Sequence, residues 1–329
     1  FIRTSEFLWQ EGHTAHETKE EAEKQVNVML KLYKDFVNEY LALPILTGKK
    51  SDKEKFVGAD YTLTLEGIMP DGKALQMGTS HQLGQNFSKP FEISFLGKDE
   101  EPHFVWQTSW GVSWRLMGAL IMIHGDDKGL ILPPKIAPIQ VVIIPIYYDE
   151  GKKNEIIKVI KKIKEQLDEK GVRSHVDSSE QHTPGWKFNQ WEMKGVPIRV
   201  EIGPKDLDND SLVVVKRNSR DKKNIAISDN PANHIMRELE VIQDELFESA
   251  KMKHSEMIFK SDEYKELCNR LANDKGFIKS AWCGSRKCED KIKDETGADV
   301  RLIEDEVISS SCIVCGNDAT NSVYFAKSY

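Results

Sequence analysis

The stretch from residue 136 to residue 176 constrains the fold more than any other part of this chain. It contains an apolar strand in IAPIQVVIIPIYY, an amphipathic helix over 152–170 and a second strand in VRSHVD. Isoleucines and a leucine repeat along one face of the helix, and Gly171 is placed to end it. Two strands joined by a helical crossover are typical of a parallel or mixed sheet. The strands VPIRVEIG and SLVVVKR follow, so we expect a small α/β domain of roughly a hundred residues.

The 329 residues exceed one ordinary hydrophobic core, so the length predicts two or three domains, and the pattern along the chain favours three. The Pro133-Pro134 pair separates an N-terminal domain, 1–134, from the α/β domain, which we place at 135–240. The remaining residues, 241–329, hold four of the five cysteines and are interpreted as a separate α+β module.

The N-terminal domain alternates helices with antiparallel strands. A capping box at Thr18 and Glu21 opens a long amphipathic helix, which we expect to end near Pro44. Residues 56–108 are typical of short strands joined by turns, and 112–123 of a buried helix followed by an apolar strand, GLILPP. This mixture predicts an α+β domain built on an antiparallel sheet.

Charge is distributed unevenly along the chain. The net charge of -7 argues against bulk electrostatic binding to a polyanion. Nevertheless, residues 152–170 hold seven lysines against four acids, and residues 186–223 hold nine Lys/Arg against six acids. Such segments are commonly solvated faces, but a local basic face also suits nucleic acid. Trp186, Phe188 and Trp191 could stack on unpaired bases or belong to the core.

A membrane span is not expected. The most apolar run, residues 136–148, is too short and too interrupted by proline to cross a bilayer.

Residues 3–16, RTSEFLWQEGHTAH, crowd charged, aromatic and imidazole groups together. A zincin-type metal site needs the order His-Glu-x-x-His on one helical turn, whereas here Glu11 precedes both histidines and Gly12 interrupts any helix. Alternation of Phe7, Trp9 and Glu11 with their neighbours has the period of two of a strand. We therefore expect a strand that lines a polar pocket.

The cysteines form two close pairs, CGSRKC at 283–288 and CIVCG at 312–316. Four thiolates in two pairs suit a closed tetrahedral zinc site, while reduced thiols or two disulfides are the alternatives. We favour a structural Zn²⁺ held by Cys283, Cys288, Cys312 and Cys315.

Arg115 is expected within an apolar helix, where an unpaired guanidinium would be costly. The sequence leaves open whether its partner is a carboxylate of the protein or a phosphate of a ligand. Gln76, Thr79 and His81 lie around Gly78 in LQMGTSHQLGQNF, a polar stretch that suits either an ordinary loop or a ligand-facing turn.

Several of these motifs resemble those of prolyl-tRNA synthetases of the archaeal and eukaryotic type. FIRTSEFLWQEGH resembles the second signature motif of class II aminoacyl-tRNA synthetases, and SWGVSWRLMGALIMIHGDDKGLILPPKIAPIQVVIIPI resembles the third motif running into the anticodon-binding domain. TPGWKFNQWEMKGVPIRVEIGPKDL and the ending from CIVCG to FAKSY are similar to the same type. The resemblance covers essentially the whole chain.

This resemblance implies ligation of L-proline to the proline tRNA in two steps. Proline's carboxylate would attack the α-phosphate of ATP to give prolyl-adenylate and pyrophosphate, and the prolyl group would then pass to the tRNA. Such chemistry depends on positioning and charge neutralisation by arginines and Mg²⁺. By motif, Arg3 and Arg115 would be catalytic. The ATP-binding set would be Arg3, Phe7, Gln76, Thr79 and Arg115, and the proline-binding set Trp9, Glu11, His13, His81, Trp110 and Gly111.

The resemblance also assigns roles outside the pocket. Lys187, Glu201 and Lys205 would contact the anticodon, the cysteine module would hold structural Zn²⁺, and Tyr329 would fold back toward the catalytic domain. A cytoplasmic homodimer is implied. Only 96 residues separate His13 from Trp110, so we expect no built-in editing domain.

The first motif of the family and its proline-binding upstream loop would precede residue 1, as would the first arginine of the second motif. We therefore expect that the native protein is longer than this chain. The alternatives are another class II synthetase, of threonyl or seryl type, or a catalytically silent tRNA-binding or scaffold relative.

Overall fold

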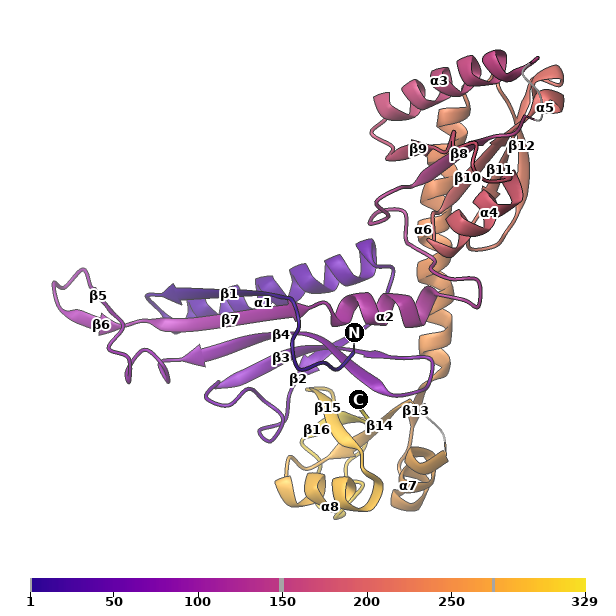
Figure 1. The fold of residues 1–329 in the computed structure, drawn as a ribbon. Helices are drawn as coiled ribbons and strands as arrows, with labels where there is room; N and C mark the ends of the chain where they lie inside the picture. Colours follow the sequence, from indigo (N-terminus) through magenta and orange to yellow (C-terminus); the bar gives the residue numbers. More distant parts are fainter. Residues whose placement is uncertain (1, 148–150, 274–275) are drawn as a thin grey trace. The chain divides into compact units, whose positions relative to one another are not determined.

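The structure is a computed structural model, and it describes residues 2–147, 151–273 and 276–329 (Figure 1). Two compact units are present. The first comprises residues 1–39, 43–123 and 251–329, and it is called here the catalytic unit because it contains the motifs whose resemblance implies catalysis; the second comprises 40–42 and 124–250.

A long, mainly antiparallel sheet forms the frame of the catalytic unit. Among the described residues its strand order is β1-β7-β4-β3-β2-β15-β16-β14-β13, with only β13 and β14 parallel. The N-terminal strands are β1 (Trp9–His16), β2 (Leu46–Lys49), β3 (Tyr61–Ile68), β4 (Ala74–Gly84) and β7 (Trp106–Ser113), and β5 (Ser94–Leu96) and β6 (Pro102–Phe104) form a separate hairpin. The C-terminal strands are β13 (Ile258–Lys260), β14 (Phe277–Trp282), β15 (Asp299–Glu304) and β16 (Asn321–Ala326). The expected antiparallel sheet is confirmed.

Helix α1 (Lys19–Asp35) covers β4 and β7 on one face of this sheet (Figure 1). The predicted capping box is present, since the Thr18 side chain accepts from the Glu21 amide and Glu21 reaches back to the Thr18 amide. Val26 is buried against the sheet, and its carbonyl accepts a hydrogen bond from Ser80 of β4. The regular α-helix ends earlier than the position expected near Pro44, because residues Phe36–Tyr40 form a π-helical segment, η1.

Two other local predictions need correction. Helix α2 (Arg115–His124) begins at Arg115, because residues 112 and 113 still belong to β7. The apolar run 129–134 is not a strand. Leu130 and Leu132 donate single hydrogen bonds to Met193 and Gly195, but the two prolines that follow have no N–H with which to continue a ladder.

The second unit contains the α/β domain expected from the sequence. Its sheet has the order β12-β11-β10-β8-β9, in which β8 is parallel to β9 and β10, and β11 and β12 continue antiparallel. The strands are β8 (Val141–Pro145), β9 (Ser174–Val176), β10 (Ile198–Ile202), β11 (Ser211–Lys216) and β12 (Lys222–Ala226). The helices are α3 (Lys153–Glu169), α4 (Pro184–Met193), α5 (Pro204–Asp208) and α6 (Pro231–Glu256), whose last six residues belong to the catalytic unit.

The aromatic residues of α4 divide between core and surface. Phe188 and Trp191 pack against Val142 and Ile144 of β8, so they belong to the core. Trp186 is 44% exposed and stacks on the ring of His182. Of the three, Trp186 alone is presented for stacking with a ligand.

The C-terminal residues join the sheet of the catalytic unit, although the sequence suggests a separate module. Strand β15 pairs with β2 through Ile303 and Lys49, and Leu302, Phe277 and Ile68 share one apolar cluster. Helices α7 (Tyr264–Asn273) and α8 (Arg286–Thr296) complete this part. The C-terminal residues belong to this sheet because β15 pairs with β2, a pairing that the sequence of neither strand predicts.

In the part of the chain that the structure describes, no helix has the length and apolarity to traverse a bilayer.

Candidate active site

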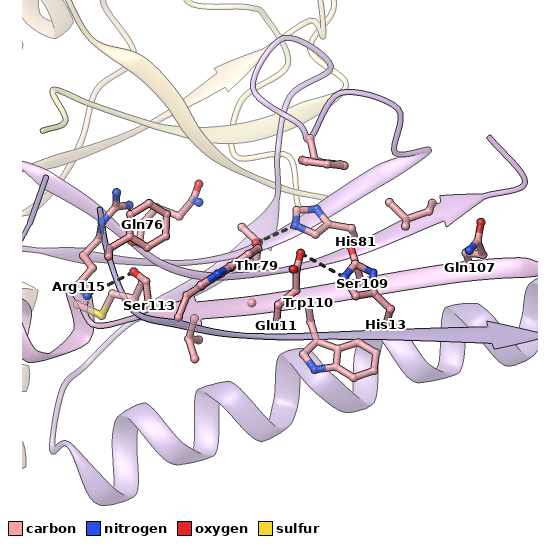
Figure 2. A pocket seen from close by; sticks show the side chains of 18 of the residues that line it. Glu11, His13, Gln76, Thr79, His81, Gln107, Ser109, Trp110, Ser113 and Arg115 are labelled. Carbon is pink, nitrogen blue, oxygen red and sulfur yellow. Dashed lines mark hydrogen bonds and ion pairs between the residues drawn. The ribbon is translucent and has the colours of Figure 1, made fainter. Parts of the chain in front are cut away.

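A pocket of about 470 Å³ opens on the face of β1, β7 and β4 opposite α1 (Figure 2). Strand register explains its composition. Glu11 stands opposite Gly111, which in turn pairs with Thr79, and His13, Ser109 and His81 form the next row. Because every second residue of a strand faces the same side, these rows present one polar surface. The lining residues are Phe7, Trp9, Glu11, His13, Phe56, Gln76, Met77, Gly78, Thr79, His81, Leu83, Phe87, Gln107, Ser109, Trp110, Gly111, Val112, Ser113 and Arg115.

Ten of the eleven residues predicted for ATP and proline therefore line one pocket, and Arg3 does not. Arg3 is exposed and precedes β1, but its charge lies close enough to Arg115 to lower the pKa of that guanidinium.

Trp110 borders the pocket from the opposite side of β7. Its indole ring lies on the α1 side of β7, against Gly12, so it borders the pocket without facing His81 (Figure 2).

Two ends of the pocket differ in chemistry. Arg115, Gln76 and Ser113 lie at one end, and His13, His81 and Ser109 lie farther along the strands (Figure 2). Phe7 and Trp9, each more than half exposed, meet edge to face with ring centroids 6.2 Å apart. The pocket thus combines a cationic end, exposed aromatic rings and an imidazole-lined end.

Arg115 is half-buried at the start of α2, where its Nε donates to the carbonyl of Ile2 at 3.1 Å and its Nη1 to that of Gln76 at 3.2 Å. Neither bond goes to a carboxylate, so the intramolecular salt bridge considered from the sequence is not formed. Burial and the charge of Arg3 lower the pKa of Arg115 below its ordinary value. An arginine held by carbonyls retains a full positive charge to offer an anion.

His81 is held between two hydroxyl groups. Its Nδ1 lies 2.9 Å from Thr62 Oγ1 and its Nε2 2.9 Å from Thr79 Oγ1. Burial, aided by the charge of His13, lowers the pKa of His81 to about 4. The ring is therefore neutral at physiological pH, with one nitrogen donating and the other accepting. His13 in turn lies 3.3 Å from Glu11, with both side chains partly exposed.

Several lining residues were missed by the sequence analysis. Gln107, Ser109 and Ser113 continue the period of two along β7, so the alternation in WQTSWGVS could have identified them. Phe56 and Phe87 come from connecting segments, and no local pattern marks them.

The C-terminus folds onto the catalytic unit, as expected. Tyr329 donates to Asp71 at 2.6 Å, and the amide of Ala74 donates to Lys327 at 2.8 Å. Tyr329 is thus attached to Asp71, three residues before β4 begins, and it is outside the set of residues that line the pocket.

The candidate anticodon residues gather near the carboxyl ends of the parallel strands of the second unit. Glu201, near the end of β10, forms a 2.8 Å ion pair with Arg199, and Lys205 is exposed on α5 just beyond. Lys187 is buried and donates to the carbonyl of Asp177, the residue that follows β9. Ligands commonly bind at this edge of α/β sheets.

The four paired cysteines converge, as the sequence predicts. The Sγ atoms of Cys283, Cys288, Cys312 and Cys315 all lie within 4.8 Å of one another, and Cys283 is 3.7 Å from both Cys288 and Cys315. A tetrahedron with Zn–S bonds of about 2.3 Å has sulfur atoms about 3.8 Å apart, so the donor set fits zinc. None of the five cysteines forms a disulfide. Burial would raise the pKa of Cys312, but backbone donors at Cys315 and Val314 outweigh it and lower the pKa to about 7.

Comparison with family models gives three matches along the chain. Residues 1–124 match the class II tRNA synthetase core domain (G, H, P, S and T), residues 140–233 the anticodon-binding domain, and residues 264–329 the C-terminal domain of prolyl-tRNA synthetase.

Individual relatives agree with these matches. The chain is 51% identical to the proline–tRNA ligase of Cenarchaeum symbiosum, with 100% of this chain and 69% of the relative covered. It is 49% identical to the proline–tRNA ligase of Natranaerobius thermophilus, with 100% and 68% covered. Among solved structures, prolyl-tRNA synthetase of Cryptosporidium parvum complexed with L-proline and AMP has a TM-score of 0.94 at 41% identity, covering 100% of this chain and 71% of that one. With its core, anticodon-binding and C-terminal domains all accounted for, this chain belongs to the prolyl-tRNA synthetase family.

Proposed function

We propose that this chain carries the ATP and proline site of an enzyme that joins L-proline to the proline tRNA through a prolyl-adenylate. One observation carries the proposal. A single pocket holds a carbonyl-bound arginine at one end and a neutral imidazole, His81, beside His13 and Glu11 at the other. The relatives named above are proline–tRNA ligases, and the Cryptosporidium structure holds proline and AMP together.

The nucleotide is proposed to occupy the end with Arg115. Arg115 would neutralise phosphate charge, Gln76 and Thr79 would orient the nucleotide, and Phe7 would stack on adenine. Arg3, which is exposed and lies outside the pocket lining, would reach the outer phosphates once they are bound. Mg²⁺ would enter with those phosphates, since it is usually held by few protein carboxylates together with substrate oxygens.

Proline is proposed to occupy the other end. Trp9, Glu11, His13 and His81 would surround the imino acid, with Gly111 as floor and Trp110 supporting that floor from beneath. Among the lining residues, Glu11 supplies the carboxylate for the protonated secondary amine of proline, and His81 offers a neutral hydrogen-bonding edge.

The remaining roles are proposed for the second unit and the cysteines. Glu201, Lys187 and Lys205 would read the anticodon, the first two after exchanging their present partners for bases. Cys283, Cys288, Cys312 and Cys315 would hold a structural Zn²⁺. We further propose that the protein acts as a homodimer in the cytoplasm, which sedimentation of the purified protein and imaging of a tagged copy would test.

Proline-dependent exchange of pyrophosphate into ATP tests the activity. The complete reading frame that contains this chain should exchange with proline and much less with threonine or serine. Exchange with either of those in place of proline would support a threonyl or seryl enzyme instead. Binding of the proline tRNA with no exchange for any amino acid would establish the silent tRNA-binding relative.

A further inference from the structure

A buried cluster of charges lies behind the nucleotide end of the pocket. Glu66 of β3 is 0% exposed, and three partners surround its carboxylate. Lys50 Nζ lies 2.6 Å and Thr64 Oγ1 2.9 Å from Oε1, while Arg301 of β15 donates through Nε at 3.1 Å and Nη2 at 3.0 Å to Oε2. Arg301 is the member of this cluster that comes from the C-terminal part of the chain.

Strand register connects the cluster to the pocket. Glu66 stands directly opposite Gln76 in the pairing of β3 with β4, next to a register shift that follows Leu65. The carbonyl of Gln76 accepts the Nη1 hydrogen bond of Arg115. A chain of contacts therefore runs from Arg301 through Glu66 and the β3–β4 pair to Arg115.

The same face of β3 supports the pocket along its length. Thr62 binds His81, Thr64 stands opposite Thr79, and Glu66 stands opposite Gln76. Of these three supports, Glu66 is the one whose position depends on a residue more than 200 positions away in the sequence, Arg301.

Electrostatics agrees with this geometry. Burial alone would raise the pKa of Glu66, but Lys50 and Arg301 reverse that effect and lower it, so the carboxylate is charged. The charges of Glu66 and Arg301 also act on the pKa of Arg115, in opposite directions. Removing one partner from a buried charge cluster leaves a charge poorly compensated, so the remaining groups must shift.

We propose that Arg301 is a positioning residue for nucleotide binding, which holds Glu66 and thereby the Gln76–Arg115 contact that receives ATP. Through it, docking of the cysteine-bearing C-terminal part is coupled to the nucleotide half of the pocket. The inference rests on the proposed assignment of Arg115 and Gln76 to ATP.

The test compares three variants of the complete reading frame. Arg301→Met removes the charge and both donors, and Arg301→Lys keeps the charge but loses the two-donor geometry. Lys53→Met is the matched control. It breaks another contact between the N-terminal and C-terminal parts of the catalytic unit, the 2.6 Å pair of Lys53 with Asp290 of α8, which does not involve Glu66.

Two readouts are needed, steady-state pyrophosphate exchange and calorimetric binding of a non-hydrolysable ATP analogue without proline. For Arg301→Met we expect a loss of about tenfold in analogue affinity and a similar rise in KM for ATP, with KM for proline changed less than about twofold. Arg301→Lys should recover part of the loss, and Lys53→Met should leave both constants near those of the unchanged protein.

A purely structural role for Arg301 would appear as equal changes in both KM values, or as an equal effect of Lys53→Met, and either result would overturn the proposal. Should Arg301→Met fail to fold, Arg301→Lys decides the question, since unchanged analogue affinity in that variant also overturns it. Absence of proline-dependent exchange in the unchanged protein would count against the proposed function, whereas the analogue-binding comparison would still test Arg301.

Discussion

Gly12 lies directly opposite Trp110 in the pairing of β1 with β7, and a Cβ on Gly12 would come within 2.4 Å of the indole ring. The ring occupies the space that a side chain would need, because it packs across the strand on the side that faces α1. The absence of a side chain at Gly12 therefore sets how closely β1 approaches the floor of the pocket.

Substitution Gly12→Ala should consequently destabilise the catalytic unit by about 1–3 kcal/mol, the usual cost of overpacking. The free energy of unfolding, measured in urea, checks this expectation. Gly185→Ala is a suitable control, since nothing lies within 4 Å of the Cβ that it would add and alanine favours its helix. An equal loss of stability in both variants would contradict the packing argument.

The burial of His81 predicts how stability depends on pH. Its pKa of about 4 in the folded protein is below the ordinary value near 6.5, so between these values the unfolded chain binds a proton that the folded chain does not. Stability should therefore be full above about pH 6.5 and fall as the pH drops toward 4, by up to ~3 kcal/mol from this group.

His81→Gln removes that titration and should flatten the dependence of unfolding free energy on pH in this window. His254, also buried with a pKa lowered to about 4 by desolvation, should supply a similar slope that remains in the variant. Chemical denaturation at several pH values between 4 and 8 provides the measurement, and an unchanged slope in His81→Gln would show that the ring titrates normally.

Some features of the pocket could be predicted from the sequence and others could not. The period of two in residues 7–13 correctly predicts which side chains share a face, because alternation is a local property of a strand. Ser109 and His81 come together through the pairing of β7 with β4, and the sequence of neither strand specifies their register. Arg115 could be expected near ATP from its motif, but its carbonyl partners, Ile2 and Gln76, come from two segments far from it in the sequence.

The sheet shows the same limit on a larger scale. Strands β8, β10 and β11 and helix α3 of the second unit could be predicted, because each buries an apolar face of its own. The mostly exposed strand β12 and the short helices α4 and α5 were not predicted. The pairing of β15 with β2, and with it the contact of Arg301 with Glu66, joins strands that lie far apart in the sequence. A cysteine-rich segment therefore resembles an independent module in the sequence although it completes another sheet.

The cysteine cluster gives a prediction with an internal control. Zinc content, measured by atomic absorption, should be about one ion per chain and should fall in Cys312→Ser and Cys315→Ser, because structural zinc needs all four ligands. Cys268→Ser should retain the metal, since Cys268 lies on α7 outside the cluster. Protein purified without any zinc and with five equally reactive thiols would refute the assignment.

Arg115 should contribute to exchange through its charge and its orientation. Arg115→Met should lower kcat/KM for pyrophosphate exchange by about a hundredfold, because one preorganised charge on a developing phosphate is worth ~2.7 kcal/mol. Arg173 is a control of matched chemistry, since its guanidinium also donates to backbone carbonyls, those of Ala137 and Pro134, within the second unit. Exchange needs no tRNA, so Arg173→Met should leave it unchanged, and a comparable loss in both variants would place the effect in folding.

The anticodon residues should affect only the second step. Glu201 lies in the second unit beside Arg199, so Glu201→Gln should leave pyrophosphate exchange intact and reduce aminoacylation of the proline tRNA. A contact between a side chain and a base edge is worth about 1–3 kcal/mol, which corresponds to a rise of roughly five- to 150-fold in KM for tRNA. Lys205→Ala should have a smaller effect that weakens with added salt, because an exposed lysine acts through screened charge. If Glu201→Gln lowered exchange and aminoacylation equally, Glu201 would have to act on the fold or the catalytic pocket, and the anticodon would have to be read elsewhere on the second unit.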